Sequence, residues 1–277
     1  MPALRCTVRR CEGALAIDGA SLRCPRGHTF DRAREGYWNL LQPQDRRSLH
    51  AGDRDEAVAA RRRWLSRGFA SGLLSSLRDA ISHGSMKDGG TAIDVGCGEG
   101  TFTSGLLSAR GGDGVGIDLS VKAVALAARL APSLTWIVAN ADRGIPLASG
   151  SVTLALSIFA RRPAAELARV LSPDGKLVVV VPGADDLIEL RRAAQGEGSL
   201  RDRAPGVADE LAATFTLAAR SEWRDRARHD RDALEDALAM SYRGARARER
   251  ERLAGLAAAD VTMSASILTL VPRDGLR

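Results

Sequence analysis

The feature that most constrains the fold is a glycine-rich segment at residues 94–100, which follows a short apolar run. Asp94 ends the run, and Gly96, Gly98 and Gly100 follow at alternate positions. This order is typical of a buried parallel strand that opens onto a nucleotide at its carboxyl end. Glycine is needed where a ligand lies against the backbone itself. The segment therefore predicts the first strand and turn of a βαβ unit with a nucleotide site.

A second acidic residue, Asp118, closes the next short apolar run. In sheets of this kind a carboxylate at that point accepts hydrogen bonds from the hydroxyl groups of a ribose. The pattern D-x-G-x-G-x-G differs from the plain dinucleotide fingerprint and resembles the S-adenosylmethionine site of Rossmann-like methyltransferases. The alternative is a glycine-rich turn in another nucleotide-binding sheet.

This resemblance implies a cofactor site at the ends of three successive strands. The glycine loop would place backbone N–H groups near the methionine carboxylate. Asp118 would hold the ribose, and Asn140 or Asp142 would contact the edge of the adenine. A plain turn residue is an equally good interpretation of Asp142. Cys97, inside the loop, is interpreted as a small filler beside the cofactor rather than as a nucleophile. The predicted contacts are Asp94, Gly96, Gly98, Glu99, Gly100, Asp118, Asn140 and Asp142.

Apolar runs and helical periods alternate along the chain, which predicts an α/β fold with a mostly parallel sheet. We expect strands at residues 91–95, 114–118, 134–138, 151–157, 175–181, 214–218 and 261–271. We expect helices at residues 55–69, 72–82, 101–109, 120–130, 163–171, 184–195 and 207–213. The last strand should be reversed, as in the seven-stranded methyltransferase sheet.

Residues 220–252, between the last two predicted strands, are rich in arginine interleaved with acidic residues. Interleaved charges favour the solvated face of a helix over a stripe that binds nucleic acid. We therefore predict two helices in this segment.

Four residues near the start of the chain have the spacing of metal ligands. Cys6 and Cys11 have four residues between them, Cys24 and His28 have three, and twelve residues separate the pairs. Thiolates and imidazole in these numbers suit a closed tetrahedral zinc site, and the alternative is a set of unpaired buried thiols. Two short strands joined by a turn at Asp18 would form a knuckle that folds only with metal bound. The remaining histidines are predicted to be surface residues: His50, His83 and His229.

The 277-residue chain is long enough for one large α/β domain with a small appendage. We divide it into a zinc-binding knuckle (1–36), a linker with leading helices (37–85) and a Rossmann-like methyltransferase domain (86–277). No apolar run is long enough for a membrane helix, and no signal segment opens the chain. We expect a cytoplasmic protein without a membrane partner.

The net charge of +6 suits a polyanionic partner such as nucleic acid. The basic residues are almost all arginine, which reflects composition as much as function. Charge alone therefore leaves the partner open, and the sequence also leaves open whether the chain forms a homodimer.

Taken together, the knuckle and the glycine loop resemble the rRNA methyltransferases that modify N1 of a guanine in the large ribosomal subunit. The resemblance covers essentially the whole chain. Its members methylate a hairpin of 23S rRNA that lines the peptide exit tunnel, in a housekeeping branch and in a branch that confers macrolide resistance. The resemblance implies S-adenosylmethionine, a structural zinc ion and an RNA partner recognised with help from the knuckle. The arginine-rich composition leans toward resistance. The resemblance rests, beyond the knuckle and loop, on residues 28–31, 35–41, 60–62, 159–160 and 182–183.

The sequence departs from that family at positions that the resemblance links to the cofactor. Phe69 and Asp186 stand where family members contact S-adenosylmethionine, and Arg161 replaces a proline expected two residues after Phe159. The resemblance therefore implies Phe69 and Asp186 as cofactor contacts with altered chemistry.

Guanine N1 carries a proton, so the site needs a proton acceptor and a base held out of its loop. We expect Phe159 to stack on that base, with a core phenylalanine as an equal alternative. Asp186 and Glu35 are candidate acceptors. Two other functions remain open: a methyltransferase of small molecules and a non-catalytic RNA-binding protein.

Overall fold

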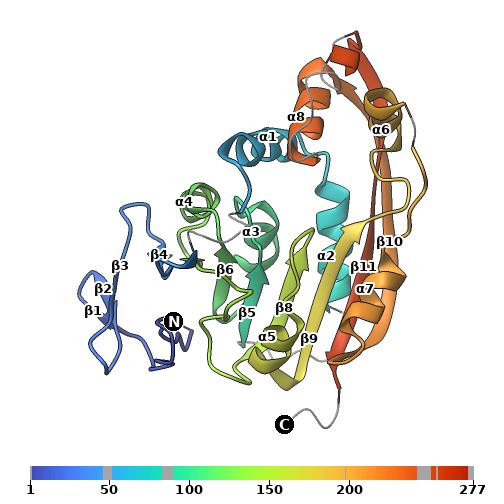
Figure 1. Ribbon diagram of the computed structural model, residues 1–277. Coiled ribbons are helices and arrows are strands. Elements are labelled where there is room, and N and C mark those ends of the chain that lie inside the picture. The colour runs from blue at the N-terminus through green and yellow to red at the C-terminus, as the bar shows by residue number, and fades with distance from the viewer. Residues whose placement is uncertain are drawn as a thin grey trace.

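The computed structural model of the protein describes residues 2–45, 52–82, 90–196, 198–241, 251–253 and 255–273. Its main sheet is built from β4 (Trp38–Asn39), β5 (Thr91–Val95), β6 (Gly114–Asp118), β7 (Thr135–Val138), β8 (Val152–Ile158), β9 (Leu171–Pro182), β10 (Phe215–Asp230) and β11 (Ala258–Pro272). The strand order is β10-β11-β9-β8-β5-β6-β7-β4 (Figure 1). The strands from β9 to β4 run parallel, and β11 is antiparallel to both neighbours. The predicted α/β sheet with a reversed last strand is confirmed.

Helices cover both faces of this sheet. They are α1 (Asp55–Ser66), α2 (Ser71–Ser82), α3 (Thr101–Leu107), α4 (Val121–Leu130), α5 (Ala164–Val170), α6 (Ile188–Gln195), α7 (Ala204–Leu211) and α8 (Arg231–Ser241). Successive residues of β9 show the two layers: Leu177 and Val179 pack with α5 and α7, while Val178 and Val180 pack with α2 and α3. A strand buried on both faces has to be apolar throughout, which explains the β-branched run of β9. None of the helices in the described ranges is long and apolar enough to span a membrane.

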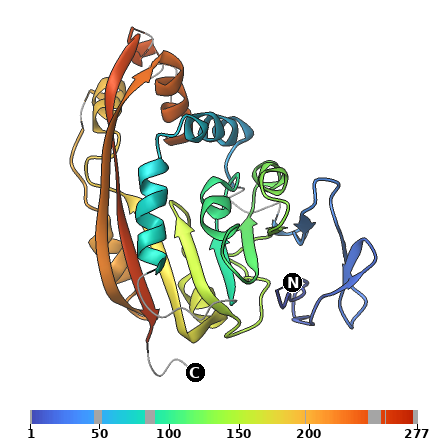
Figure 2. The ribbon, with the colours of Figure 1, turned by 180° about the vertical axis from the view of Figure 1, so that it is seen from behind.

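The knuckle forms a three-stranded antiparallel sheet beside β4, at the opposite end of the molecule from the antiparallel strands β10 and β11 (Figure 2). Its strands are β1 (Ala16–Asp18), β2 (Ser21–Arg23) and β3 (Thr29–Asp31). The turn at Asp18 connects the first two strands as predicted, and Gly19 takes the left-handed conformation there. Leu22 and Phe30 of the knuckle are buried in the same apolar cluster as Leu147 of the main domain. The knuckle therefore shares its core with the edge of the sheet.

The segment after α7 differs from the prediction. A strand was expected only up to residue 218, with helices beyond it, but β10 continues to Asp230 and pairs along its length with β11. The charged residues at even positions from Arg220 to Arg228 lie on one exposed face, whereas Trp223 and Ala227 on the other face are partly buried. Charges that alternate with period two fit a strand, so the helix prediction for residues 220–230 was wrong. Helix α8 supplies the helical structure that was expected further along.

Smaller differences concern the ends of elements. Strand β9 starts at Leu171, four residues before the predicted start at residue 175, and its register against β8 shifts between Val152 and Leu154. Strand β4 lies in the segment interpreted as a linker, yet it pairs with β7 at the edge of the sheet. The boundary proposed at residue 85 lies outside the described residues, so the domain limits stay predictions.

The prediction that His229 lies on the surface is wrong. His229 is fully buried, and its Nε2 atom accepts a hydrogen bond of 3.0 Å from Nε1 of Trp64. Its Nδ1 atom lies 3.0 Å from the carbonyl oxygen of Ala227, so Nδ1 carries the proton of a neutral ring. The contact joins α1 to β10. His50 and His83 lie outside the described residues.

Acidification should weaken this contact. Burial lowers the pKa of His229 below its ordinary value, so the stability it contributes is complete above about pH 6.5 and is lost as the pH falls below that value. We expect the melting temperature of the wild type to fall more between about pH 7.5 and about pH 5.5 than that of His229→Gln, whose amide oxygen accepts from Trp64 without titrating. Equal falls in both proteins would contradict this assignment.

Candidate active site

A cleft of about 410 Å³ lies at the carboxyl ends of β5, β6 and β8. Its floor is the glycine loop between β5 and α3, and its roof is α1, which contributes Arg61 and Leu65. Helix α1 is placed beyond the strand ends by its packing against α8 (Figure 1). The cleft therefore has the position at which open α/β sheets bind nucleotides.

The glycine loop is folded tightly against the neighbouring strands. The N–H of Gly96 donates to the carbonyl of Ile117 at 2.8 Å, and a Cβ atom at Gly96 would stand 2.4 Å from Cβ of Ala160. Gly96 and Gly98 both have left-handed backbone angles. Side chains are therefore excluded at these two positions, and a ligand in the cleft meets the backbone there directly.

Asp118 lies at the end of β6, where the sequence predicted a ribose contact. One carboxylate oxygen accepts the N–H of Gly98 at 3.0 Å, and the other accepts the N–H of Ser120 at 2.8 Å. A carboxylate has about four lone-pair positions, so both oxygens keep capacity for hydroxyl donors from the cleft. Removal from water raises the pKa of Asp118 despite these bonds.

Acidic side chains outnumber basic ones on the loop side of the cleft. Arg61 forms ion pairs with Glu99 at 2.8 Å and with Asp53 at 2.6 Å, and its guanidinium lies against Gly98. Asp94 is buried below the loop, and burial raises the pKa of its carboxyl to about 7 even though Thr103 donates to it at 2.5 Å. One cation among several carboxylates favours a ligand that carries positive charge, as a sulfonium does.

Aromatic side chains form the outer end of the cleft. Phe159 follows β8, is 47% exposed and has a backbone φ of 54°. Its ring stands edge-on to Phe102 of α3, with centroids 6.3 Å apart. Across the opening, Arg161 pairs with Asp142 at 2.7 Å. An exposed ring on strained backbone at the mouth of a cleft fits a binding role, so the alternative of a core phenylalanine is wrong.

The structure brings only part of the predicted cofactor set into the cleft. Six of the predicted residues line it: Gly96, Gly98, Glu99, Asp118, Asn140 and Asp142. Asp94 lies beneath the loop rather than in the cleft. Gly100 packs below it as well, because a Cβ atom there would lie 2.7 Å from Cβ of Ala127.

Phe69 and Asp186 do not line the cleft. The ring of Phe69 stacks on that of His229 with centroids 4.0 Å apart, in the cluster between α1 and α8. Asp186 accepts the N–H of Ser264 at 3.0 Å, and burial raises the pKa of its carboxyl to about 6. Glu35, the other candidate proton acceptor, pairs with Arg129 at 2.9 Å and is also outside the cleft.

Several cleft residues were missed or not assigned a role from the sequence. Asp53 and Arg61 come from the segment between β4 and β5. Phe102 lies in the first turn of α3. The signal for Phe102 was its place directly after the glycine loop, where side chains flank the cofactor. Cys97 also lines the cleft, and burial raises its pKa well above the ordinary value, so it stays a neutral thiol rather than a nucleophile.

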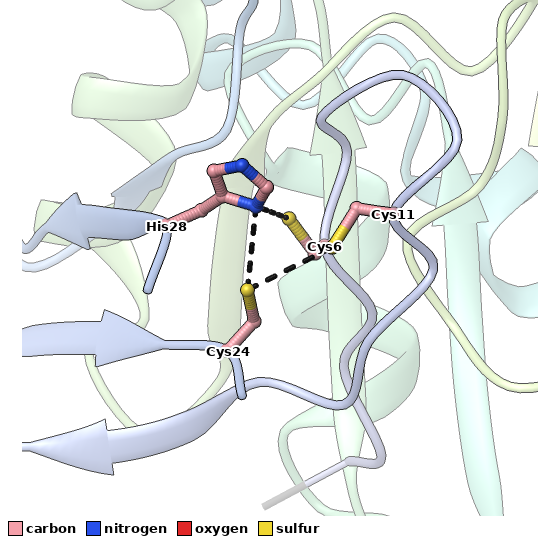
Figure 3. A group of neighbouring side chains, drawn as sticks. All are labelled: Cys6, Cys11, Cys24 and His28. Carbon is pink, nitrogen blue, oxygen red and sulfur yellow. Dashed lines mark hydrogen bonds between the residues drawn. The ribbon is translucent and has the colours of Figure 1, made fainter. Parts of the chain in front are cut away.

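The four predicted metal ligands meet in the knuckle (Figure 3). Their ligand atoms lie within 4.8 Å of one another. The Sγ atoms of Cys11 and Cys24 are 3.7 Å apart, and Nδ1 of His28 is 3.4 Å from Sγ of Cys24 and 3.5 Å from Sγ of Cys6. In a tetrahedral zinc site with Zn–S bonds of about 2.3 Å, sulfur atoms are about 3.7 Å apart. The spacing of the ligand atoms therefore fits a zinc ion with no open position.

Two short loops of the knuckle place the four ligands close together. Cys24 directly follows β2 and His28 directly precedes β3, so the tight turn between the two strands presents both. Cys6 and Cys11 lie at the ends of a loop in which Arg10 has a left-handed φ of 62°. All three cysteines are buried, and a divalent cation would offset the cost of gathering them there as thiolates.

The fold and the two sites define a class I S-adenosylmethionine-dependent methyltransferase with an N-terminal zinc ribbon. A family model for "Methyltransferase domain" matches residues 92–175, and one described as "RlmA, N-terminal", a zinc ribbon, matches residues 5–49. Among solved structures, the YcgJ protein of Bacillus subtilis superposes with a TM-score of 0.53 at 15% identity, covering 73% of this chain and 98% of that one. This similarity shows the fold.

Curated relatives show the family. The 23S rRNA (guanine(748)-N(1))-methyltransferase of Streptomyces fradiae is 36% identical over 86% of this chain and 84% of its own length. A relative from Micromonospora griseorubida, provisionally named a 23S rRNA (guanine-N(1)-)-methyltransferase, is 36% identical over 82% of this chain and 81% of its own. The chain belongs to the family of 23S rRNA guanine-N1 methyltransferases.

Loss of one ligand should unfold the knuckle and spare the main domain. We expect Cys24→Ser to lose the zinc ion, because three ligands bind it far more weakly, and the amides of residues 6–31 to lose protection from hydrogen exchange while β5–β9 keep theirs. Zinc content and exchange mass spectrometry measure both effects. Cys97→Ser, a buried thiol outside the cluster, is the control and should keep its zinc. A full equivalent of zinc in Cys24→Ser would contradict the assignment.

Proposed function

We propose that this protein transfers a methyl group from S-adenosylmethionine to N1 of a guanine in a 23S rRNA hairpin near the peptide exit tunnel. The observation that carries the proposal is the similarity over most of the chain to the Streptomyces fradiae protein, which is named for N1 of guanine 748. A cytoplasmic site of action follows from a ribosomal substrate. A role in macrolide resistance is part of the proposal, and it is supported by the resemblance to a family with a resistance branch and by the arginine-rich composition.

Different residues of the cleft would contact different parts of the cofactor. The backbone of Gly96 and Gly98, with Glu99 beside them, would meet the amino acid part, and Asp118 would hold the ribose. Asn140 and Asp142, after β7, would meet the adenine. Bound S-adenosylmethionine supplies an activated methyl group. The surrounding carboxylates favour its positive charge over the neutral sulfur of the product, which assists product release.

The aromatic end of the cleft would receive the guanine. A base that is modified at a ring atom leaves its loop and stacks on an aromatic or apolar side chain. Phe159 is exposed at the opening, and Phe102 supports it from the side. Removal of the N1 proton requires an acceptor near the base. Glu35 and Asp186 both lie outside the cleft, so neither is placed to accept this proton.

Primer extension across domain II of 23S rRNA tests the reaction and the site together. A methyl group on N1 blocks base pairing, so reverse transcriptase stops beside the modified guanine. We expect a stop in the tunnel hairpin after incubation of unmodified rRNA with the protein and S-adenosylmethionine, and none without the cofactor. No stop at any guanine, from protein that binds the cofactor, would move the substrate to another class such as small molecules.

The same assay tests the role of Phe159 with two matched variants. Stacking on a base contributes about 1–3 kcal/mol, so Phe159→Ala should lower kcat/KM for RNA between about fivefold and about 150-fold. Phe159→Trp keeps a stacking surface and should retain most of the rate. Calorimetry should show the same affinity for S-adenosylmethionine in both variants. Unchanged turnover in Phe159→Ala would contradict the stacking role.

A further inference from the structure

A second cavity lies outside the cofactor cleft, where the knuckle meets the main domain. Its volume is about 310 Å³. It is lined by the knuckle loop that carries Cys6, by the segment that follows β7, and by Glu166 and Arg169 of α5. Asn140 lines both this cavity and the cofactor cleft. The two spaces are therefore neighbours, and we refer to the second as the junction cavity.

The walls of the junction cavity are held together by defined contacts. The N–H of Arg5 donates to the carbonyl of Pro146 at 3.0 Å. The hydroxyl of Thr7 donates to the carbonyl of Leu40 at 2.6 Å, and the amide of Gln42 donates to that hydroxyl at 3.1 Å. These bonds join the knuckle to the edge of the sheet on both sides of the cavity. The space is therefore a feature of the docked knuckle rather than a loose gap.

Arginine dominates the charge of the lining, with five arginines against the three carboxylates of Glu12, Asp45 and Glu166. Two of the lining arginines are neutralised, since Arg143 pairs with Asp45 at 3.1 Å and Arg169 pairs with Glu166 at 2.7 Å. The others, on the knuckle side, form no ion pair or side-chain hydrogen bond with the described residues. These unpaired arginines are Arg5, Arg9 and Arg10.

The backbone that carries two of these arginines is fixed. Arg9 and Arg10 lie in the loop between Cys6 and Cys11, and the carbonyl of Arg10 accepts a hydrogen bond of 2.7 Å from Arg26. Arg9 and Arg10 are exposed and Arg5 is half-buried, so an anion that enters the cavity can reach their side chains. A guanidinium matches the geometry of a phosphate with two parallel hydrogen bonds.

We propose that the junction cavity binds the phosphate backbone of the RNA strand next to the target guanine, with Arg5, Arg9 and Arg10 as the phosphate contacts. This inference rests on the proposed function and locates a subsite for the same substrate. Because the cavity adjoins the cleft at Asn140, an RNA whose target base enters the cleft can place a neighbouring phosphate in the cavity. Phosphate contacts carry no sequence information, so the cavity fixes the position of the strand while the cleft selects the base.

The variant Arg9→Gln/Arg10→Gln tests this subsite in the full-length, zinc-loaded protein. Each contact to single-stranded RNA contributes about 0.7 to the slope of log affinity against log salt concentration, so loss of two should reduce the slope by about 1.4. We expect a several-fold higher KM for a 23S rRNA hairpin fragment. The kcat at saturating RNA, the affinity for S-adenosylmethionine and the zinc content should match the wild type.

The control Arg226→Gln/Arg228→Gln removes the same charge from the exposed face of β10. It should leave the KM and the salt slope near those of the wild type. Equal effects of the two double variants, or no effect of either, would overturn the junction subsite. Failure of the proposed function is distinguished by the wild type, which would then produce no stop on the RNA. If the first variant loses zinc, Arg5→Gln, outside the loop, decides the question by the same salt slope.

Discussion

The close packing of the glycine loop against its neighbours is the constraint on which the rest of the structure depends. The loop bonds to β6 below it and meets Ala160 after β8 beside it, so the ends of these strands have to lie at one level. Parallel strands place their carboxyl ends at the same edge, and short right-handed crossovers through α3 and α4 keep them there. The floor of the cleft is therefore backbone, and the specificity of the site comes from the side chains around it.

Two additions to the Rossmann-like core lie next to the cleft. The antiparallel pair β10–β11 packs with α6 and α8 in a separate apolar cluster, which holds α1 over the loop. The buried contact between Trp64 and His229 is one link in this arrangement. On the other side, the zinc ribbon docks against β4, and its arginine-rich loop lines a second cavity that shares Asn140 with the cleft. One addition to the Rossmann-like core thus covers the cleft, and the other lines the cavity next to it.

Local patterns in the sequence predicted the parts of the structure that local physics determines. The glycine loop, the alternating strands and helices, and the metal ligands were all readable, because each depends on residues close together in the chain. Strand β10 was misread because its interleaved charges were taken as a helix face, although they alternate with period two. The residues that line the cleft from other parts of the chain were harder to predict. Arg61 reaches Glu99 only after α1 has packed on α8, and no pattern near either residue shows this contact. Phe69 and Asp186 were carried over from a resemblance, and in this chain they are partly buried in contacts with His229 and Ser264 instead of lining the cleft.

The most direct test of the account is a crystal structure of the protein with S-adenosylhomocysteine. The account predicts that the ribose hydroxyl groups bind Asp118, that the amino acid part lies on the backbone between Gly96 and Glu99, and that the sulfur points toward Phe159. Ligand density outside this cleft, or a ribose held by another carboxylate, would contradict it.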